Sequence, residues 1–316
     1  MRCQKCILSD KLSDVVINDK NCNICNTPKS DYSKLQQAAE LDLAATINKL
    51  KYDRGVSFTY DCVVSLSGGK DSAYILLKLL KYKLNILAVT ADTGFLSKQA
   101  RKNINSIIKK LHVDHIFIKP HSKFIDLYKN KLTENFTDNI LNHICTKCTL
   151  IMEDHIFQLA RSIKIPVVFN GFSVDEIDAL CSIHKTTPEN VFYEQKYDDI
   201  CNPRSLSPLH IWNDSPDHIR KKLALRQILP KKKSSIFKTN CDINWLMIYN
   251  NICRRNYNPY IYMFSNIIRE SHGSRLKFLF LDKIIKITVR LRLFKPFFIR
   301  HTLKKLGLKL KDITQK

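Results

Sequence analysis

The chain has 316 residues, of which 44% are hydrophobic and 26% carry a charge, so it can bury a sizeable core. This balance excludes an intrinsically disordered chain and a collagen-like fibre. The net charge of +23 predicts an anionic partner such as a nucleotide, a nucleic acid, an acidic lipid or a phosphorylated sugar.

The distribution of apolar residues and the number of cysteines predict the cellular compartment of the protein. No apolar run approaches the ~18 residues of a transmembrane helix. The N-terminal segment MRCQKCILSD also lacks the apolar stretch of a secretory signal. We therefore expect a cytoplasmic protein without a transmembrane segment. Eleven cysteines in such a chain favour metal or redox chemistry over a disulfide scaffold.

Four zones follow one another along the chain. Residues 1–30 combine four cysteines with turn-forming residues, and residues 31–59 form a linking segment with a helix at 31–54. From 60 to 245, short apolar strands alternate with helices. Residues 246–316 are helical and basic, and this tail could lie on RNA, on an anionic membrane or on a partner, or could simply be a solvated face.

The alternation in the third zone predicts an α/β fold with a doubly wound parallel sheet. The expected strands are 60–66, 84–90, 115–118 and 166–170, and the expected helices are 73–82, 97–111, 122–132 and 145–163. Ligands of such sheets bind outside the carboxyl ends of the strands. We therefore expect the functional site at that edge.

A phosphate-binding loop is predicted at residues 67–72, SGGKDS, between the first strand and the first helix of the sheet. Two glycines allow backbone N–H groups to turn inward around an anion, and the helix N-terminus adds partial positive charge. Lys70 supplies a full charge, and the hydroxyls of Ser67 and Ser72 can donate to phosphate oxygens. The loop is too short for a Walker A motif, which has four residues between its glycines.

This loop after a buried strand resembles the pyrophosphate loop of the PP-loop, or N-type, ATP pyrophosphatases, which have a HUP-like fold. The resemblance covers about residues 60–245. It implies that ATP is cleaved between its α and β phosphates and that AMP is transferred to a substrate oxygen, from which a nucleophile then displaces it. ATP and Mg²⁺ are the implied cofactors.

Two later segments extend the resemblance. Residues 90–94, TADTG, are similar to a turn beside the nucleotide, and 170–176, NGFSVDE, are similar to the family's GHNxDD with Phe172 and Ser173 in place of His and Asn. The acidic pair could hold Mg²⁺, although it could also cap a short helix. The nucleotide site implied by the resemblance comprises Ser65, Ser67, Gly68, Gly69, Lys70, Asp71, Ser72, Thr90, Asp92, Gly171, Asp175 and Glu176. The implied catalytic residues are Lys70, Asp71 and Asp175, together with Cys145 and Cys148.

A zinc ribbon is predicted at the N-terminus, where two CxxC pairs, Cys3 with Cys6 and Cys22 with Cys25, are separated by 15 residues. Four thiolates form the usual closed structural site for Zn²⁺. A zone of ~25 residues has little core, so the metal would supply its folding energy. The ribbon followed by a helix resembles the N-acetyl sugar amidotransferase branch of the PP-loop family.

A second cysteine set consists of Cys145 and Cys148, which open a helix, and Cys241. A helix N-terminus lowers the pKa of a thiol, and three cysteines can hold a [4Fe–4S] cluster with its fourth iron open. The arrangement resembles the cluster-dependent tRNA thiolation enzymes. The acidic residues after Cys148 differ from the basic ones usual there, which weighs against a tRNA substrate. Cys181 or Cys201 could replace Cys241 as the third ligand.

Three functions are consistent with these motifs. The first is an ATP-dependent sulfurtransferase that replaces a carbonyl oxygen with sulfur, with a small molecule or tRNA as acceptor and a separate sulfur donor. The second is an amidotransferase that uses ammonia from a glutaminase partner. The third is a non-catalytic nucleotide-binding or RNA-binding module, which the intact loop and acidic pair oppose. We favour sulfur transfer, and the oligomeric state, a homodimer among the options, stays open.

Overall fold

The computed structural model describes most of the chain. The chain folds into two compact units. The sheet unit comprises Asp31–Phe124 and Cys148–Cys241, and the helical unit comprises Met1–Ser30, Ile125–Lys147 and Asp242–Lys316. The residues outside the description are 28–30, 55–58, 135–143, 174–175, 178–180, 182–185, 194–202, 213, 231–239, 270–272, 292, 294–296 and 316.

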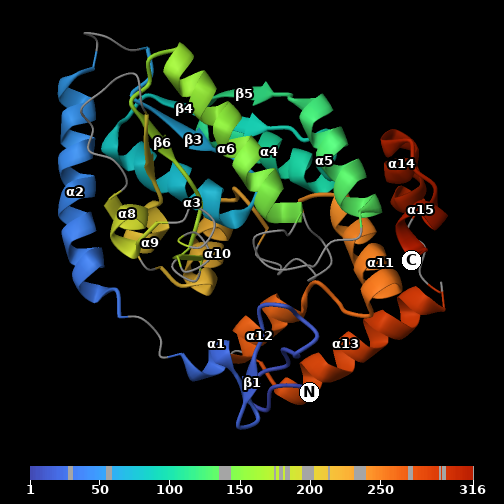
Figure 1. Cartoon of the computed structure of the whole chain (residues 1–316). Helices are drawn as coiled ribbons and strands as arrows, with labels where there is room; N and C mark the ends of the chain where they lie inside the picture. The colour runs from blue at the N-terminus through green and yellow to red at the C-terminus, as the bar shows by residue number, and fades with distance from the viewer. Residues whose placement is uncertain are drawn as a thin grey trace. The chain divides into compact units, whose positions relative to one another are not determined.

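The sheet unit is built on five parallel strands in the order β5-β4-β3-β6-β7 (Figure 1). They are β3 (Cys62–Ser65), β4 (Ile86–Ala91), β5 (Asp114–Ile118), β6 (Val167–Phe169) and β7 (Arg204–Leu206). The chain runs outward from the central β3 through β4 to β5 and then continues on the other side with β6 and β7. This reversal between β3 and β6 is the topological switch point at which sheets of this kind bind ligands. The predicted fold class is therefore confirmed.

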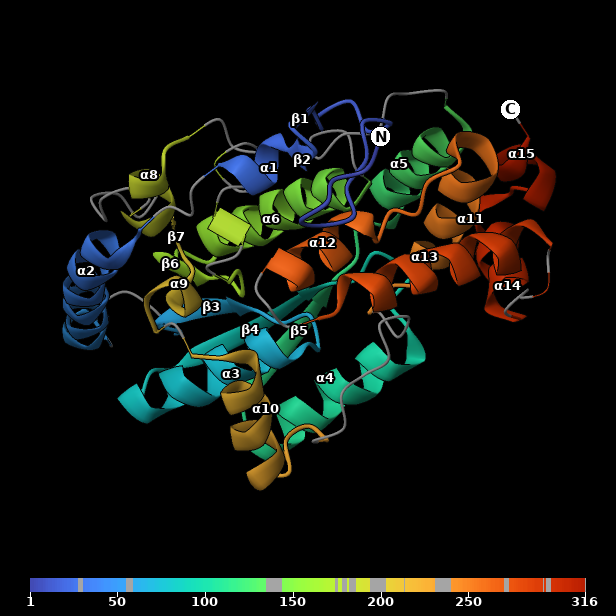
Figure 2. The same cartoon turned by 90° about the horizontal axis from the view of Figure 1, so that it is seen from below.

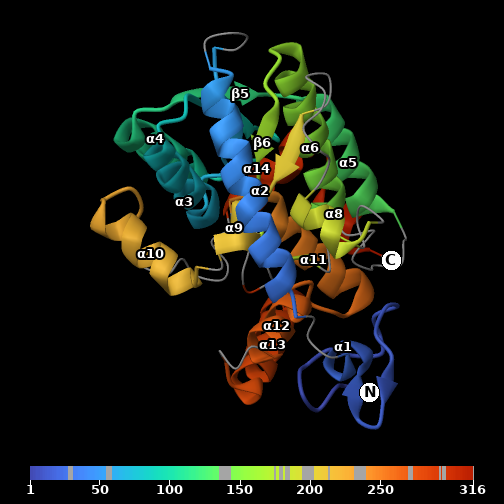
Figure 3. The same ribbon diagram turned by 90° about the vertical axis from the view of Figure 1, so that its left-hand side faces the viewer.

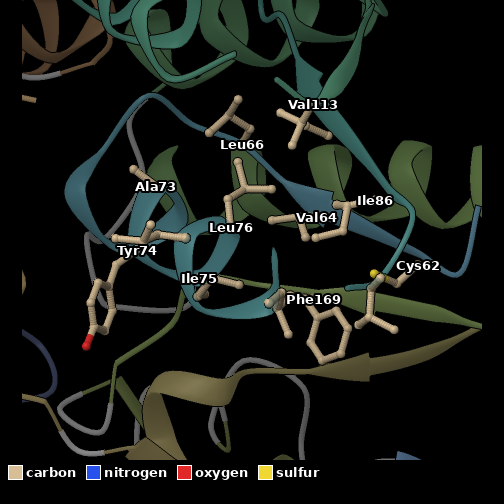
Figure 4. Close-up of a cluster of buried hydrophobic side chains, with 14 of the residues drawn as sticks. Cys62, Val64, Leu66, Ala73, Tyr74, Ile75, Leu76, Ile86, Val113 and Phe169 are labelled. Carbon is tan, nitrogen blue, oxygen red and sulfur yellow. The ribbon is translucent and has the colours of Figure 1, made fainter. Parts of the chain in front are cut away.

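Alternate side chains of β3 serve opposite faces of the sheet. Cys62 and Val64 lie in one core with the inner face of α3 (Lys70–Leu79), as Figure 4 shows. Val63 lies in the other core with Ile156 and Ala160 of α6 (Ile144–Ser162). In Figure 2, α6 covers one face, while α3, α4 (Lys98–Leu111) and α10 (Pro216–Leu225) lie on the other. Both faces are thus buried, which explains the uninterrupted apolar strands.

The remaining helices of the sheet unit flank this core. They are α2 (Ser33–Tyr52), the short 3-10 helix η1 (Leu80–Tyr82), α8 (Pro188–Tyr193) and α9 (Pro208–Trp212). Helix α5 (His121–Thr133) begins in the sheet unit and ends in the helical unit. The predicted strands and helices through residue 170 are all present, with end shifts of a few residues. Strand β7 was not predicted, because its three residues, Arg-Ser-Leu, carry too weak an apolar pattern.

An ion pair between a buried arginine and a carboxylate that is about a third exposed joins β7 to α2. The guanidinium of Arg204 donates to the carboxylate of Asp42 and, at 3.0 Å, to the hydroxyl of Thr46. The Arg204 side chain is only 5% exposed. Removing one partner of such a pair leaves a buried charge uncompensated, which is strongly destabilising.

We therefore expect Asp42→Ala to lower the free energy of unfolding by about 3 kcal/mol. Denaturant melts compared with the unaltered chain measure this change. Glu40→Ala, at an exposed position of the same helix, is the matched control and should be nearly neutral. A loss below about 1 kcal/mol would show that the pair contributes no more than a surface salt bridge.

The helical unit combines the N-terminal segment with the C-terminal helices (Figure 3). Its elements are β1 (Ile17–Asn18), β2 (Asn21–Cys22), α1 (Asn23–Asn26), α11 (Ile243–Arg255), α12 (Ile261–Arg269), α13 (Arg275–Arg290), α14 (Phe297–Leu306) and α15 (Leu310–Thr314). The Ile7 N–H donates to the Ser265 hydroxyl on α12, and the buried Asn250 of α11 donates to the carbonyls of Leu132 and Ile313. In the described part of the chain, no helix is both long and apolar enough to cross a membrane.

Candidate functional site

The loop between β3 and α3 has a backbone conformation at Gly68 that strongly favours glycine. Gly68 has a φ of +75°, and a Cβ built on it would lie 2.8 Å from the backbone oxygen of Ala100 in α4. The side chain of Asn103, one turn further along α4, donates to the Gly68 carbonyl at 3.0 Å. Helix α4 therefore fixes the loop from outside, which keeps the backbone conformation that the predicted anion site requires.

Because of this fit, we expect Gly68→Ala to destabilise the chain by about 1–3 kcal/mol and to weaken ATP binding as well. An alanine at this position would hold a strained positive φ, and its Cβ would push against the Ala100 backbone of α4. Thermal melts and nucleotide-binding titrations measure the two effects. Gly307→Ala, also at positive φ but with its nearest neighbour at 3.9 Å, is the control and should leave nucleotide binding unchanged. Unaltered binding by Gly68→Ala would contradict the assignment of the loop.

Hydroxyls close the loop at the start of α3. Ser72, buried in the first turn, accepts from the Ser67 N–H at 3.3 Å, and the Gly69 N–H donates to the Ser67 hydroxyl at 3.3 Å. The Lys70 ammonium pairs with the Asp71 carboxylate, and both side chains stay about a third exposed. The loop thus presents a helix N-terminus, a cation and a carboxylate at one edge of the sheet, a combination that suits a nucleotide phosphate with its metal.

The segment after β6 approaches this loop closely. A Cβ on Gly171 would lie 3.4 Å from the Ser72 nitrogen, so the missing side chain permits the approach. Glu176 accepts from the N–H of Ser173 at 2.8 Å and from its hydroxyl. Desolvation of the Glu176 carboxyl raises its pKa, the charge of Asp71 adds to the rise, and Ser173 and Lys70 oppose it. Glu176 is therefore electrostatically coupled to the loop. Asp175 lies outside the described residues.

The residues predicted at the end of β4 hold the turn together. Buried Thr90 donates to the Leu66 carbonyl at 2.6 Å and meets a ring nitrogen of His115 at 2.8 Å. Buried Asp92 accepts from the Gly94 N–H at 2.9 Å and from Arg101 at 2.8 Å. These contacts position the turn beside the loop. Ser65, half-buried, is the last residue of β3. A direct role of these three residues in nucleotide binding stays a prediction.

Cys241 follows a residue that lies against the phosphate loop. A Cβ on Gly69 would be 3.5 Å from the side-chain nitrogen of Asn240. The Asn240 carbonyl accepts from the Ser97 N–H at 2.9 Å, and Cys241 forms an antiparallel bridge with Leu96. The segment that carries Cys241 therefore returns to the loop within the sheet unit. Sequence reasoning missed Asn240, since no pattern marks a contact across 171 residues.

The four N-terminal cysteines form one group. Their sulfur atoms all lie within 4.8 Å of one another, and three of the four side chains are buried. Burial acts to raise the pKa of the Cys3 thiol, but N–H groups of Cys6 and Cys22, which donate to its sulfur at 3.4 and 3.2 Å, outweigh it and lower the pKa to about 7. Four converging thiols with such donors fit a tetrahedral Zn²⁺. The Arg275 guanidinium of α13 supports the group from outside by donating to the Cys6 and Cys3 carbonyls at 2.8 and 3.0 Å.

The second cysteine set is distributed over both units. Cys145, exposed, and Cys148, half-buried, lie in the first turns of α6, where the boundary between the units falls. Cys145 belongs to the helical unit, whereas Cys148 and Cys241 belong to the sheet unit. Among the residues described, no second group of three close metal-ligating side chains is found. Convergence of the three thiols stays a prediction. Of the two substitutes, Cys181 is half-buried, and Cys201 lies outside the described residues.

Comparisons with known proteins give distant similarities. No family model matches the sequence. An uncharacterized protein of Methanocaldococcus jannaschii is 24% identical over 178 residues, which are 54% of this chain and 58% of that protein. The chain thus matches little more than half the length of this relative.

The similar solved structures include three from different organisms. One is a U34-tRNA thiolase from Methanococcus maripaludis with its [4Fe–4S] cluster, at a TM-score of 0.43 and 15% identity, covering 100% of this chain and 93% of that one. The second is an NMN synthetase from Francisella tularensis, at 0.39 and 14%, covering 78% and 97%. The third is an NH3-dependent NAD synthetase from Campylobacter jejuni, at 0.39 and 19%, covering 77% and 95%.

Proposed function

We propose that the protein is an ATP-dependent PP-loop enzyme that adenylates a carbonyl oxygen of its substrate and then replaces that oxygen with sulfur. The observation that carries the proposal is the loop of residues 67–72 at the switch point, fixed by α4 and coupled electrostatically to Glu176. An anion site that a neighbouring helix fixes, with a cation and a carboxylate beside it, has little use in a purely structural turn.

The first half-reaction follows from the chemistry of the site. The loop backbone and Lys70 would bind the phosphates of ATP, and Glu176 with Asp71 would hold Mg²⁺ through carboxylate oxygens and water. The substrate carbonyl oxygen attacks the α-phosphorus, the bond to the β-phosphate bridge breaks, and pyrophosphate leaves with the electron pair. Charge develops on the leaving pyrophosphate, where Lys70 and the helix N-terminus of α3 stabilise it.

The second half-reaction needs a sulfur nucleophile near the adenylated carbon. Sulfur attacks that carbon, the carbon–oxygen bond breaks, and AMP leaves with the original oxygen. Cys145, Cys148 and Cys241 would hold a [4Fe–4S] cluster, whose open iron would present the sulfur. The return of the Cys241 segment to the loop of residues 67–72 supports this assignment, because one thiol-bearing segment then lies beside that loop.

A second candidate is amidation with ammonia from a glutaminase partner. The assembled four-cysteine group favours it, because an N-terminal zinc ribbon before a PP-loop domain resembles the N-acetyl sugar amidotransferases. The first half-reaction is the same in both cases. The two reactions differ in the nucleophile, which is sulfur in one and ammonia in the other. Only the sulfur reaction needs a cluster.

The products of ATP cleavage test the shared first step. Purified protein with Mg²⁺, ATP and a small-molecule or tRNA pool should release AMP and pyrophosphate in equal amounts. Release of ADP and orthophosphate would contradict the proposal. Iron and acid-labile sulfide in anaerobically purified protein would support sulfur transfer, whereas glutamine-dependent or ammonia-dependent turnover without iron would support amidation.

Serine substitutions test the cysteine set. We expect Cys145→Ser, Cys148→Ser and Cys241→Ser each to lose iron and product together while ATP binding persists, because two thiolates leave a cluster exposed to solvent. Metal analysis and nucleotide titration measure this. Cys62→Ser is the control, since Cys62 is a buried core residue of β3 and should leave iron content unchanged per folded molecule. If sulfur or nitrogen transfer persists in all three variants, these cysteines have a structural role and no catalytic one.

A further inference from the structure

We propose that the outward face of α13 docks on an anionic lipid surface. Six of the thirteen large hydrophobic side chains that the described residues expose lie between 276 and 293. In α13 these are Leu276, Phe280, Ile284, Ile287 and Leu291, the last at its C-cap, with Leu276 74% and Phe280 66% exposed. Such a concentration on one element of the helical unit distinguishes it from the scattered exposed apolar residues found on every protein.

The exposed residues form a single stripe. Their spacing of four, four, three and four residues keeps them on one face of a helix with 3.6 residues per turn. The stripe is about 22 Å long, from a rise of 1.5 Å per residue. A second stripe, comprising Phe278, Asp282, Ile285 and Val289, is buried and lies on the opposite side of the helix. Helix α13 is therefore already anchored by one face, and the stripe on the other remains to be covered.

The charges beside the exposed stripe have one sign. Lys283 and Arg290 flank it on one side and Lys277 on the other, and all three are exposed. The one acid of α13, Asp282, is buried and paired with Arg2 and Lys286 at 2.9 Å each. The outward face thus combines aliphatic and aromatic side chains with uncompensated cations, the pattern of a helix that lies in a membrane interface.

The exposed stripe could be covered by a second copy of the chain, by RNA or by an anionic bilayer, and its pattern favours the bilayer. A second copy of the chain would bring the same cations against each other, which opposes self-association. RNA would pair with the lysines, but Phe280 is the single aromatic ring of the stripe. Its other members, Leu276, Ile284, Ile287 and Leu291, offer no flat ring on which successive bases stack. An anionic bilayer matches both features, because lipid phosphates meet the cations and the acyl boundary takes up the aliphatic side chains.

Co-sedimentation of the full chain with lipid vesicles tests the proposal. We expect binding to vesicles that contain phosphatidylglycerol, weak binding to pure phosphatidylcholine, and loss of binding as salt is raised. The double variant Phe280→Ser with Ile287→Ser should bind at least about tenfold more weakly. Lys283→Glu with Arg290→Glu should abolish the preference for anionic lipid. Circular dichroism and ATP cleavage check that each variant is folded.

A matched control removes exposed apolar side chains elsewhere. Leu41→Ser with Leu225→Ser changes two leucines that are each 74% exposed on α2 and α10, and vesicle binding should be unaltered. The proposal is overturned if the unaltered chain ignores anionic vesicles or if the Phe280 and Ile287 variant binds them as tightly. It is also overturned if the same variant loses RNA binding or a dimer instead of vesicle binding.

Discussion

Replacing Lys70 by alanine is expected to lower the rate of ATP cleavage to AMP and pyrophosphate by about 10²–10³-fold, with the fold intact. The ammonium lies in the first turn of α3, a third exposed and paired with Asp71, so it contributes little to the core. In the proposed reaction, its effect would fall on the transition state, where charge moves onto the leaving pyrophosphate. Quantifying pyrophosphate and AMP at saturating ATP measures the loss.

Asp71→Ala is expected to lower the rate of ATP cleavage by a similar factor, but through the loss of a carboxylate for Mg²⁺. The carboxylate is within electrostatic reach of Glu176, and together they form the anionic side of the site. Removing it should weaken Mg²⁺ binding, so that a higher metal concentration is needed for the remaining activity. The Lys70 variant should keep its metal dependence, and this difference separates the two roles.

A matched substitution distinguishes these effects from general loss of charge. Lys81→Ala removes an exposed lysine from η1, directly after α3, and should leave the rate unchanged. Equal losses from Lys81→Ala and Lys70→Ala would show that net charge alone matters. If the Lys70 variant released pyrophosphate at an unchanged rate, Lys70 and its loop would have no part in ATP cleavage.

The central sheet and its phosphate loop could be predicted from sequence because both depend on local pattern. Strands buried on both faces give short apolar runs, and a loop that turns tightly from strand to helix needs Gly68 in its positive-φ conformation. The same reasoning placed the four N-terminal cysteines together, since two CxxC pairs leave few other arrangements that bury them. Each of these signals is confined to one short segment of the chain.

Long-range features could not be predicted because no local pattern encodes them. Arg204 pairs with Asp42 across 162 residues, and Asn240 meets Gly69 across 171. The contacts of the Thr90 hydroxyl with the Leu66 carbonyl and with His115 could not be predicted either, and the role of Thr90 at the nucleotide stays a prediction. A polar residue at a strand end has the same appearance in sequence whether it meets a ligand or the neighbouring strand.

Removing the metal from the N-terminal group is expected to unfold residues 1–26 and to loosen α12 and α13 as well. Zinc in such sites contributes apparent free energies of about 10–16 kcal/mol, far more than a segment of this size can gain from its own core. The Arg275 guanidinium is bound to the Cys3 and Cys6 carbonyls, and Ser265 accepts from Ile7. Loss of the ribbon would therefore leave these groups on α12 and α13 without their partners.

Cys22→Ser tests this coupling together with metal content. The unaltered chain should carry one zinc at the four-cysteine group, and the variant should lose it, with faster hydrogen exchange in α12 and α13 and lower solubility. Cys253→Ser, in α11 of the same unit, is the control and should keep its zinc. The chemistry of ATP cleavage should persist in any variant protein that stays folded, because a closed four-thiolate site offers no open coordination position. Unchanged zinc content in the Cys22 variant would show that the four thiols are not one tetrahedral site.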